Sequence, residues 1–424
     1  MHQKDQSLEG LRGLASLAVV LAHFLFVFFP YLSNNMRPYP NAKPKTVIDA
    51  WLVYPPFSLS YAADAAVLVF FVLSGYVLTA KFYAKNDIEL FESAAVRRYF
   101  RLALPALASV LFAWLLLKAD FMGNQMARVL NTAGWPIHYY TEKVSLDYAV
   151  FIGLIGAPFF GNTALNGPLW SLQVELIGSI LLFACYALFG RRSLLMTVVW
   201  FVFFANILGG RSPAVLNYVA ILLGSLLHPI AGWLRRNPWV STSLVVLGLI
   251  AVSYDNSPRF TLLRVISLPN FQPYGPDFNQ DHRIFWHSLG AVFLVSGVIG
   301  ARWFAALLAS RIPTYLGRIS FAIYLLHMPL IMSLAFWTAK AGQVLGMGYI
   351  ARGTFAAAIF FGALVVLAEL FTRYVDGPAI RFSSWISNHL NAASQRSDVP
   401  SDPEHNAPSA ESSTDVSSRE QVVT

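Results

Sequence analysis

Long apolar runs separated by short polar segments dominate the sequence. Ten of these runs come close to the roughly 17–25 residues that a membrane-spanning helix needs. They lie at about residues 11–30, 62–80, 99–117, 170–189, 194–209, 214–231, 239–254, 284–301, 317–338 and 352–372. The pattern therefore predicts an all-α, multi-pass integral membrane protein of about ten transmembrane helices.

Two segments depart from this pattern. Residues 148–160 are apolar but short for a span, and we expect a re-entrant or interfacial helix there. From about residue 391 the chain becomes rich in Ser, Pro, Asp and Glu and has no aromatic residue, a composition typical of disorder. We therefore expect one transmembrane domain over residues 1–390 and a disordered cytoplasmic tail over residues 391–424.

Composition strengthens the membrane prediction. Of the 424 residues, 56% are hydrophobic and 12% are charged, and that charged share is about half of what a soluble protein carries. Basic residues gather in the short loops of one side, including the pairs 191–192 and 235–236, which predicts that both termini are cytoplasmic. Cys185 is the only cysteine, so no intrachain disulfide and no cysteine-based metal site can form.

The first apolar run, LEGLRGLASLAVVLAHF at residues 8–24, contains an arginine and a histidine. Arg12 and His23 are 11 residues apart, which is about three helical turns, so both lie on one helix face. Arg12 then lies at the membrane edge and His23 near the middle. Ionisable side chains in a membrane helix face the protein interior or a wet cavity. His23 is thus either a functional residue or a structural histidine bonded to a neighbouring helix.

Two further stretches carry polar residues into the apolar pattern. Arg98 and Arg101 in VRRYFRLALP share a helix face at the cytoplasmic edge, where they either anchor the helix or bind phosphates. In DAAVLVFFVLSGYVLTAKF, Asp64 lies near the outer end of the helix. Ser74 and Gly75 in the same stretch let another backbone approach closely, and we expect a packing seam there.

Two later helices hold the remaining candidates. In NGPLWSLQVELIGSILL, Glu175 falls among apolar residues, and it needs a cation, a histidine or water as its partner. The alternative is a purely structural pair with an arginine. In LGRISFAIYLLHMPLI, Ser320, Tyr324 and His327 share a helix face, where His327 either packs with one hydrogen bond or contacts a substrate.

Taken together, these stretches resemble the acyltransferase-3 family of membrane acyltransferases. The matching segments, in the family's order over about residues 8–385, are LEGLRGLASLAVVLAHF, FFVLSGYVL, RRYFRL, LWSLQVE, ISFAIYLLHMPL and FTRYVDGPAIRF. The resemblance implies a ten-helix domain in an inner (plasma) membrane that moves an acyl group, usually acetyl from acetyl-CoA, to a carbohydrate hydroxyl. The implied acceptors are cell-surface polysaccharides or lipid-linked precursors.

The resemblance also assigns roles to particular residues. We expect His23 to act as general base, with Glu175 orienting its imidazole. The arginines of the family's Arg-x10-His and Arg-x-x-Arg patterns are expected to bind the CoA phosphates; they are Arg12, Arg98 and Arg101. The expected substrate contacts are Asp64, Ser74, Trp170, Tyr324 and His327. Many members have Asp where this chain has Leu68, and Asp64, one turn earlier, is the candidate substitute.

These assignments define the expected ligands. The donor is acetyl-CoA or another acyl-CoA, and the partners are a carbohydrate acceptor and the lipid bilayer. Neither a metal nor a nucleic acid is expected, and the sequence indicates no particular oligomeric state.

Three other functions fit the same polar residues. A non-catalytic exporter of a polar glycan precursor would use them as a solute path. A glycosyltransferase with a polyprenyl-phosphate donor would add paired acidic residues at a membrane edge, and a membrane scaffold would need no reactive residue at all. Acyl product formed from acyl-CoA separates the acyltransferase from these alternatives.

Overall fold

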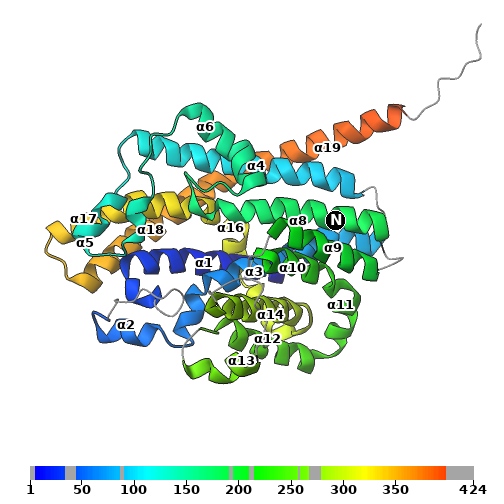
Figure 1. Cartoon of the computed structure of the whole chain (residues 1–424), viewed down its shortest axis with the longest axis horizontal. Helices are drawn as coiled ribbons and strands as arrows, with labels where there is room; N and C mark the ends of the chain where they lie inside the picture. Colours follow the sequence, from blue (N-terminus) through cyan, green and yellow to red (C-terminus); the bar gives the residue numbers. More distant parts are fainter. Residues whose placement is uncertain are drawn as a thin grey trace, which may run out of the picture.

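The fold is helical throughout the described residues, as the apolar pattern predicts (Figure 1). The structure, a computed structural model, describes residues 5–33, 44–85, 90–190, 194–209, 214–255, 258–266 and 278–397. The longer helices are α1 (Gln6–Phe28), α3 (Ala63–Lys85), α4 (Leu90–Lys118), α8 (Trp170–Phe189), α9 (Leu194–Gly209), α10 (Ala214–Ser225), α11 (Leu227–Arg236), α12 (Pro238–Val252), α14 (Phe278–Gly300), α16 (Arg311–Leu330), α17 (Phe336–Val344), α18 (Tyr349–Phe371) and α19 (Gly377–Ser397). The shorter ones are α2 (Val47–Leu52), α5 (Ala127–Leu130), α6 (Leu146–Phe151), α7 (Ala157–Phe160), α13 (Thr261–Ile266) and α15 (Arg302–Leu308).

The structure does not confirm the full count of ten spans that the apolar runs predict. Within the described residues, seven helices are long and apolar enough to cross a membrane, or eight if α10 and α11, bent by 56°, form one span. The two remaining expected spans are the helices at 194–208 and 238–252, which are apolar but shorter. The segment at 146–160 is also a short apolar helix, and its re-entrant or interfacial position stays a prediction.

Helix α1 has clear signals at both ends. The Oδ1 atom of Asp5 accepts a hydrogen bond from the backbone N–H of Ser7 at 3.0 Å, which caps the first turn. The helix ends at Phe28, and Pro30 follows shortly after it; the residue before a proline disfavours helical backbone. α1 is therefore a single uninterrupted helix that carries both Arg12 and His23.

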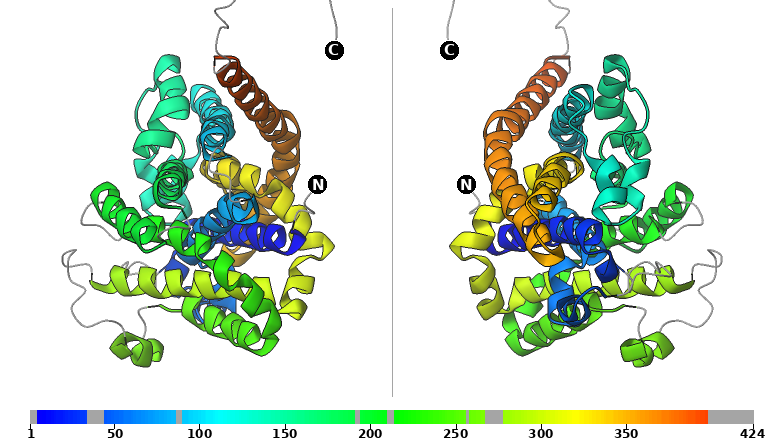
Figure 2. Two further views of the ribbon diagram at one scale, coloured as in Figure 1. Left: turned by 90° about the vertical axis from the view of Figure 1, so that its right-hand side faces the viewer. Right: turned by 90° about the vertical axis from the view of Figure 1, so that its left-hand side faces the viewer.

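Helices α1 and α16 pack closely enough to exclude side chains at their crossing. A Cβ atom added to Gly13 would lie 2.4 Å from the backbone nitrogen of Gly317, and one added to Gly317 would lie 2.1 Å from the carbonyl oxygen of Glu9. Small residues permit this kind of close helix contact. α1 also packs on α3 and lies in the middle of the bundle (Figure 2). The crossing therefore holds the α1 and α16 histidines on facing helices.

The C-terminal helix extends beyond the expected domain boundary. A π-turn at Thr372–Asp376 connects α18 to α19, which packs on α4 and then projects away from the bundle (Figure 2). α19 continues to Ser397, so residues 391–397 of the expected tail are helical. The rest of that tail, residues 398–424, lies outside the described residues.

Candidate active site

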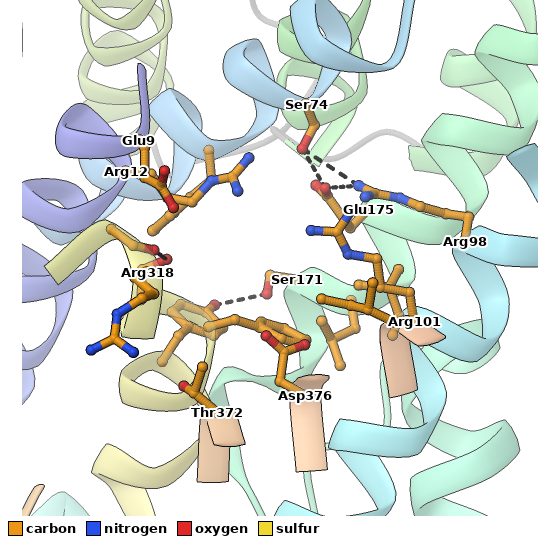
Figure 3. Close-up of a pocket in the computed structure, with 18 of the residues that line it drawn as sticks. Glu9, Arg12, Ser74, Arg98, Arg101, Ser171, Glu175, Arg318, Thr372 and Asp376 are labelled. Carbon is orange, nitrogen blue, oxygen red and sulfur yellow. Dashed lines mark hydrogen bonds and ion pairs between the residues drawn. The ribbon is translucent and has the colours of Figure 1, made fainter. Parts of the chain in front are cut away.

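Four arginines line a cavity of about 280 Å³ near the N-terminal end of α1 (Figure 3). We call it the arginine cavity. Its walls come from α1, α3, α4, α8 and α16, together with the α18–α19 turn. The charged residues of its lining are Arg12, Arg98, Arg101, Arg318, Glu9, Glu175 and Asp376. The four guanidinium groups of this lining offer hydrogen-bond donors suited to an anionic ligand.

Glu175 is paired with an arginine inside this cavity. Arg98 forms an ion pair with Oε1 of Glu175, and the Ser74 hydroxyl donates to the same oxygen. Arg98 also donates from Nε to the hydroxyl of Ser179 at 3.2 Å. Glu175 therefore has the arginine partner that the sequence left open as an alternative to His23. A buried carboxylate between apolar helices is most stable beside a cation, and the arginine of α4 is the cation that the packing supplies.

Arg12 and Arg101 point into the arginine cavity from opposite sides (Figure 3). Arg318 is different, because its two terminal nitrogens donate to the two carboxylate oxygens of Glu369 at 2.9 and 2.7 Å. The planar guanidinium group binds phosphate oxygens in a bidentate manner. Arg12 and Arg101 are therefore the arginines best placed to bind an anion in the cavity.

His23 lies in a second cavity of about 360 Å³, which we call the histidine cavity. The aromatic side chains in its lining are Phe26, Trp135, Tyr139, Trp170 and Tyr324. Its polar lining includes Asp64, Thr163 and Arg283. The mixture of flat aromatic surfaces with a few polar groups is typical of sites for small organic ligands.

The hydrogen bond of His23 fixes its tautomer. Nδ1 lies 2.9 Å from the carbonyl oxygen of Val19, one turn earlier on α1. A carbonyl can only accept, so Nδ1 carries the hydrogen and Nε2 keeps the lone pair that a base needs. The helix backbone thus orients the imidazole of His23.

His327 lies directly beside His23. The centroids of the two rings are 5.1 Å apart. His327 is fully buried, and its Nδ1 donates to the carbonyl oxygen of Tyr324 at 2.8 Å. Its Nε2 atom has no hydrogen-bond partner in the described part of the chain. From the sequence, His327 either packs with one hydrogen bond or contacts a substrate. Its buried position and single backbone hydrogen bond match the first possibility.

Asp64 forms an ion pair that the sequence did not reveal. Its Oδ2 atom lies 2.6 Å from Nη2 of Arg283, whose side chain is almost fully buried. Arg283 was missed because it precedes the expected span at 284–301 and looked like part of the loop, whereas α14 begins at Phe278. Trp135 and Tyr139 were also missed, although the aromatic cluster in GWPIHYY was a visible signal.

Two residues belong to the lining of both cavities, Val67 of α3 and Tyr324 of α16. The hydroxyl of Tyr324 lies 2.7 Å from that of Ser171 and donates to the carbonyl oxygen of Pro168 at 3.1 Å. At the start of α8, Trp170 lines the histidine cavity while Ser171 lines the arginine cavity. The two cavities are therefore neighbours that meet at the start of α8.

The comparison with known families decides the identity of this fold. The acyltransferase-3 family model, described as an acyltransferase domain, matches residues 5–371. The chain belongs to this family. It is a membrane acyltransferase, and the match spans every charged residue described above except Asp376 of the arginine cavity.

Curated acyltransferases match over most of their length. The chain is 25% identical to "Acyltransferase R4" of Phoma sp., covering 88% of this chain and 93% of that protein. It is 24% identical to "Acyltransferase clz18" of Cochliobolus lunatus, with the same two shares. It is 23% identical to "O-acetyltransferase PaAT-1" of Phomopsis amygdali, covering 90% of this chain and 84% of that protein. No solved structure matches this chain.

The residues expected from the sequence lie in or beside the two cavities, in two groups, and their roles stay predictions. Arg12, Ser74, Arg98, Arg101 and Glu175 line the arginine cavity. His23, Asp64 and Trp170 line the histidine cavity, Tyr324 lines both, and His327 packs behind His23. Among the described residues, no group of three or more His, Cys, Asp or Glu side chains is arranged to hold a metal ion.

Proposed function

We propose that this membrane acyltransferase moves an acyl group, in the first place acetyl, from acyl-CoA to a hydroxyl of a carbohydrate. One observation carries the proposal: an arginine-lined cavity and a cavity with a tautomer-fixed histidine meet at Val67 and Tyr324. The first has the chemistry to bind the phosphates of a donor, and the second has a base for an acceptor. Donor and acceptor would meet where the two cavities adjoin, beside Val67 and Tyr324.

The proposed reaction uses the lone pair on Nε2 of His23. The acceptor hydroxyl gives its proton to Nε2 while its oxygen attacks the thioester carbonyl carbon. The C–S bond then breaks, and the CoA thiolate takes the proton from the imidazolium. The products are an ester and the CoA thiol, and His23 returns to its neutral form. A positioned general base of this kind contributes about 10²–10⁴-fold to a rate.

We place the donor in the arginine cavity, with its phosphates on Arg12 and Arg101. Arg98 also lines this cavity, and its charge is balanced by Glu175. A third cavity of about 230 Å³ shares Arg98 and Arg101 with the first and is also lined by Lys81 and Arg97. Its two further cations suit the 3′-phosphate at the nucleotide end of CoA. Because CoA is a cytoplasmic metabolite, this end of α1 would face the cytoplasm of a cell with the protein in its plasma membrane, as would both termini.

We place the carbohydrate in the histidine cavity. Sugar rings present apolar C–H faces and several hydroxyls, and they need both flat aromatic surfaces and hydrogen-bond acceptors. The flat aromatic surfaces come from Trp135, Tyr139 and Trp170, and the Asp64 carboxylate is a hydrogen-bond acceptor. His23 lies in the same lining, within reach of a hydroxyl bound there.

The test of this function is product formation by the purified chain in lipid nanodiscs. With acetyl-CoA and methyl hexosides as acceptors, we expect release of the CoA thiol and a sugar mass increased by one acetyl group. Cyclohexanol, which offers one hydroxyl but no sugar ring, should be acylated much more slowly. If no acceptor leads to release of the CoA thiol, acyl-CoA is not the donor. If cyclohexanol is acylated as fast as the methyl hexosides, the acceptor is not a carbohydrate.

The position of the nucleotide end has a separate test with 3′-dephospho-acetyl-CoA. Wild type should show a higher KM for this donor than for acetyl-CoA. The double substitution Lys81→Gln and Arg97→Gln should raise the KM for acetyl-CoA and leave that for the dephospho donor unchanged. Equal effects of the substitutions on both donors would place the 3′-phosphate elsewhere.

A further inference from the structure

The wall between the two cavities consists of side chains with little freedom to move. Tyr324 is 7% exposed, and its hydroxyl is held by Ser171 and by the carbonyl oxygen of Pro168. Its ring packs against that of Phe70, with centroids 6.0 Å apart. Val67 is 8% exposed and β-branched, so it has few side-chain rotamers. These two side chains are therefore held in place, and they set the shape of the junction between the two cavities.

This wall lies where an acyl group would be transferred. On the function proposed above, the phosphates of the donor bind on one side of the wall and the base that activates the acceptor lies on the other. The thioester carbon must then reach the junction that Val67 and Tyr324 border. The rest of the acyl chain has to fit against the same two side chains, because they are the residues that line both cavities.

We propose that Val67 and Tyr324 determine which acyl group the protein accepts, and that they restrict it to a short one. This inference rests on the proposed acyl-CoA-dependent function and adds its selectivity. An apolar pocket discriminates about 10–200-fold for each methylene that it cannot accommodate. Both side chains are buried, so each further methylene of an acyl chain would have to fit against them. Val67 is the side chain to substitute, since Tyr324 is also held by hydrogen bonds to Ser171 and to the carbonyl oxygen of Pro168.

Val69 provides a matched control for Val67. Both are buried valines of α3, with exposed fractions of 3% and 8%, respectively. Val69 lines neither cavity. Replacing either valine by alanine removes the same two methyl groups from the same helix. Only the change at Val67 enlarges the junction.

The experiment measures kcat/KM for acetyl-, propionyl-, butyryl- and hexanoyl-CoA with the purified chain, from release of the CoA thiol. Wild type should prefer acetyl-CoA. Val67→Ala should raise the butyryl-to-acetyl ratio about tenfold or more, and Val67→Leu should lower the propionyl-to-acetyl ratio. Val69→Ala should leave both ratios unchanged.

Two results would overturn the inference. The first is a wild-type preference for hexanoyl-CoA, and the second is equal ratios in wild type and in every folded Val67 variant. Val67→Leu, which adds rather than removes volume, provides the test if Val67→Ala fails to fold. Failure of the proposed function looks different, because wild type would then release no CoA thiol from any of the four donors.

Discussion

At the residue scale, the site is governed by how buried charges find partners. Arg98 and Glu175 lie on different helices, and the exposed fractions of their side chains are 10% and 14%. Removing one partner of a buried ion pair leaves an uncompensated charge and costs about 3–5 kcal/mol, whereas removing both can be nearly neutral. The pair therefore stabilises the arginine cavity only as a unit.

A double-substitution cycle tests this coupling. We expect Glu175→Gln to lower the thermal unfolding temperature of the detergent-solubilised protein more than the double change Arg98→Gln with Glu175→Gln does. The reason is that the single change leaves the Arg98 charge without its carboxylate. If the decrease in unfolding temperature of the double variant equals the sum of the decreases of the two single variants, Arg98 and Glu175 are not energetically coupled.

The sequence indicated which ionisable residues line the two cavities, but not which partners they have. Arg12, His23 and Glu175 were identifiable because ionisable residues in apolar helices are rare. Their partners depend on which helices lie side by side, and Glu175 and Arg98 are 77 positions apart. Arg283 shows the same limit, because nothing near Asp64 in the sequence indicates that α14 supplies its cation.

At the element scale, the crossing of α1 and α16 positions both histidines. The helices themselves were predictable from the apolar pattern, since each of the ten expected spans contains a helix in the structure. Their contacts were not, because Gly13 and Gly317 look like ordinary helix glycines until the backbones are seen to touch. The count of ten spans stays a prediction, since the helices at 194–208 and 238–252 are apolar but shorter than 18 residues in the described part of the chain.

A pair of glycine substitutions tests the crossing. Gly13→Ala should lower the thermal unfolding temperature and the activity, because its Cβ atom would meet the backbone of Gly317 at 2.4 Å. Gly362 is the matched control, a glycine of α18 with open space around the position of a Cβ atom. Gly362→Ala should be neutral or stabilising by up to about 1 kcal/mol, since alanine favours helices. Equal destabilisation by both substitutions would contradict the close α1–α16 contact.

At the scale of the whole molecule, the cavities define a direction across the membrane. Arg12 lines the arginine cavity near the N-terminal end of α1, and His23 in the neighbouring histidine cavity lies about 16 Å further along the helix, from the rise of 1.5 Å per residue. A donor from one side and an acceptor from the other could then meet at the wall. This arrangement requires the arginine cavity to open toward the cytoplasm.

Thiol labelling tests that orientation. Cys185 is the only cysteine of the chain and is buried, so Cys185→Ala gives a background without thiols. In this background, Arg101→Cys should react with a membrane-impermeant maleimide in inverted membrane vesicles but not in intact cells. Arg101 is exposed and lines the arginine cavity, so a cysteine there is open to the reagent. Labelling in intact cells would place the arginine cavity on the outer side.

The most direct test of the account compares two histidines. His389 of α19 has the same local geometry as His23, with Nδ1 2.9 Å from the carbonyl oxygen four residues earlier, but it is exposed and lines neither cavity. With acetyl-CoA and a sugar acceptor, His23→Ala should lower kcat/KM at least about 100-fold, while His389→Ala should leave it unchanged. Both proteins should unfold at the wild-type temperature. A folded His23→Ala protein that releases CoA at the wild-type rate would show that His23 is not the base.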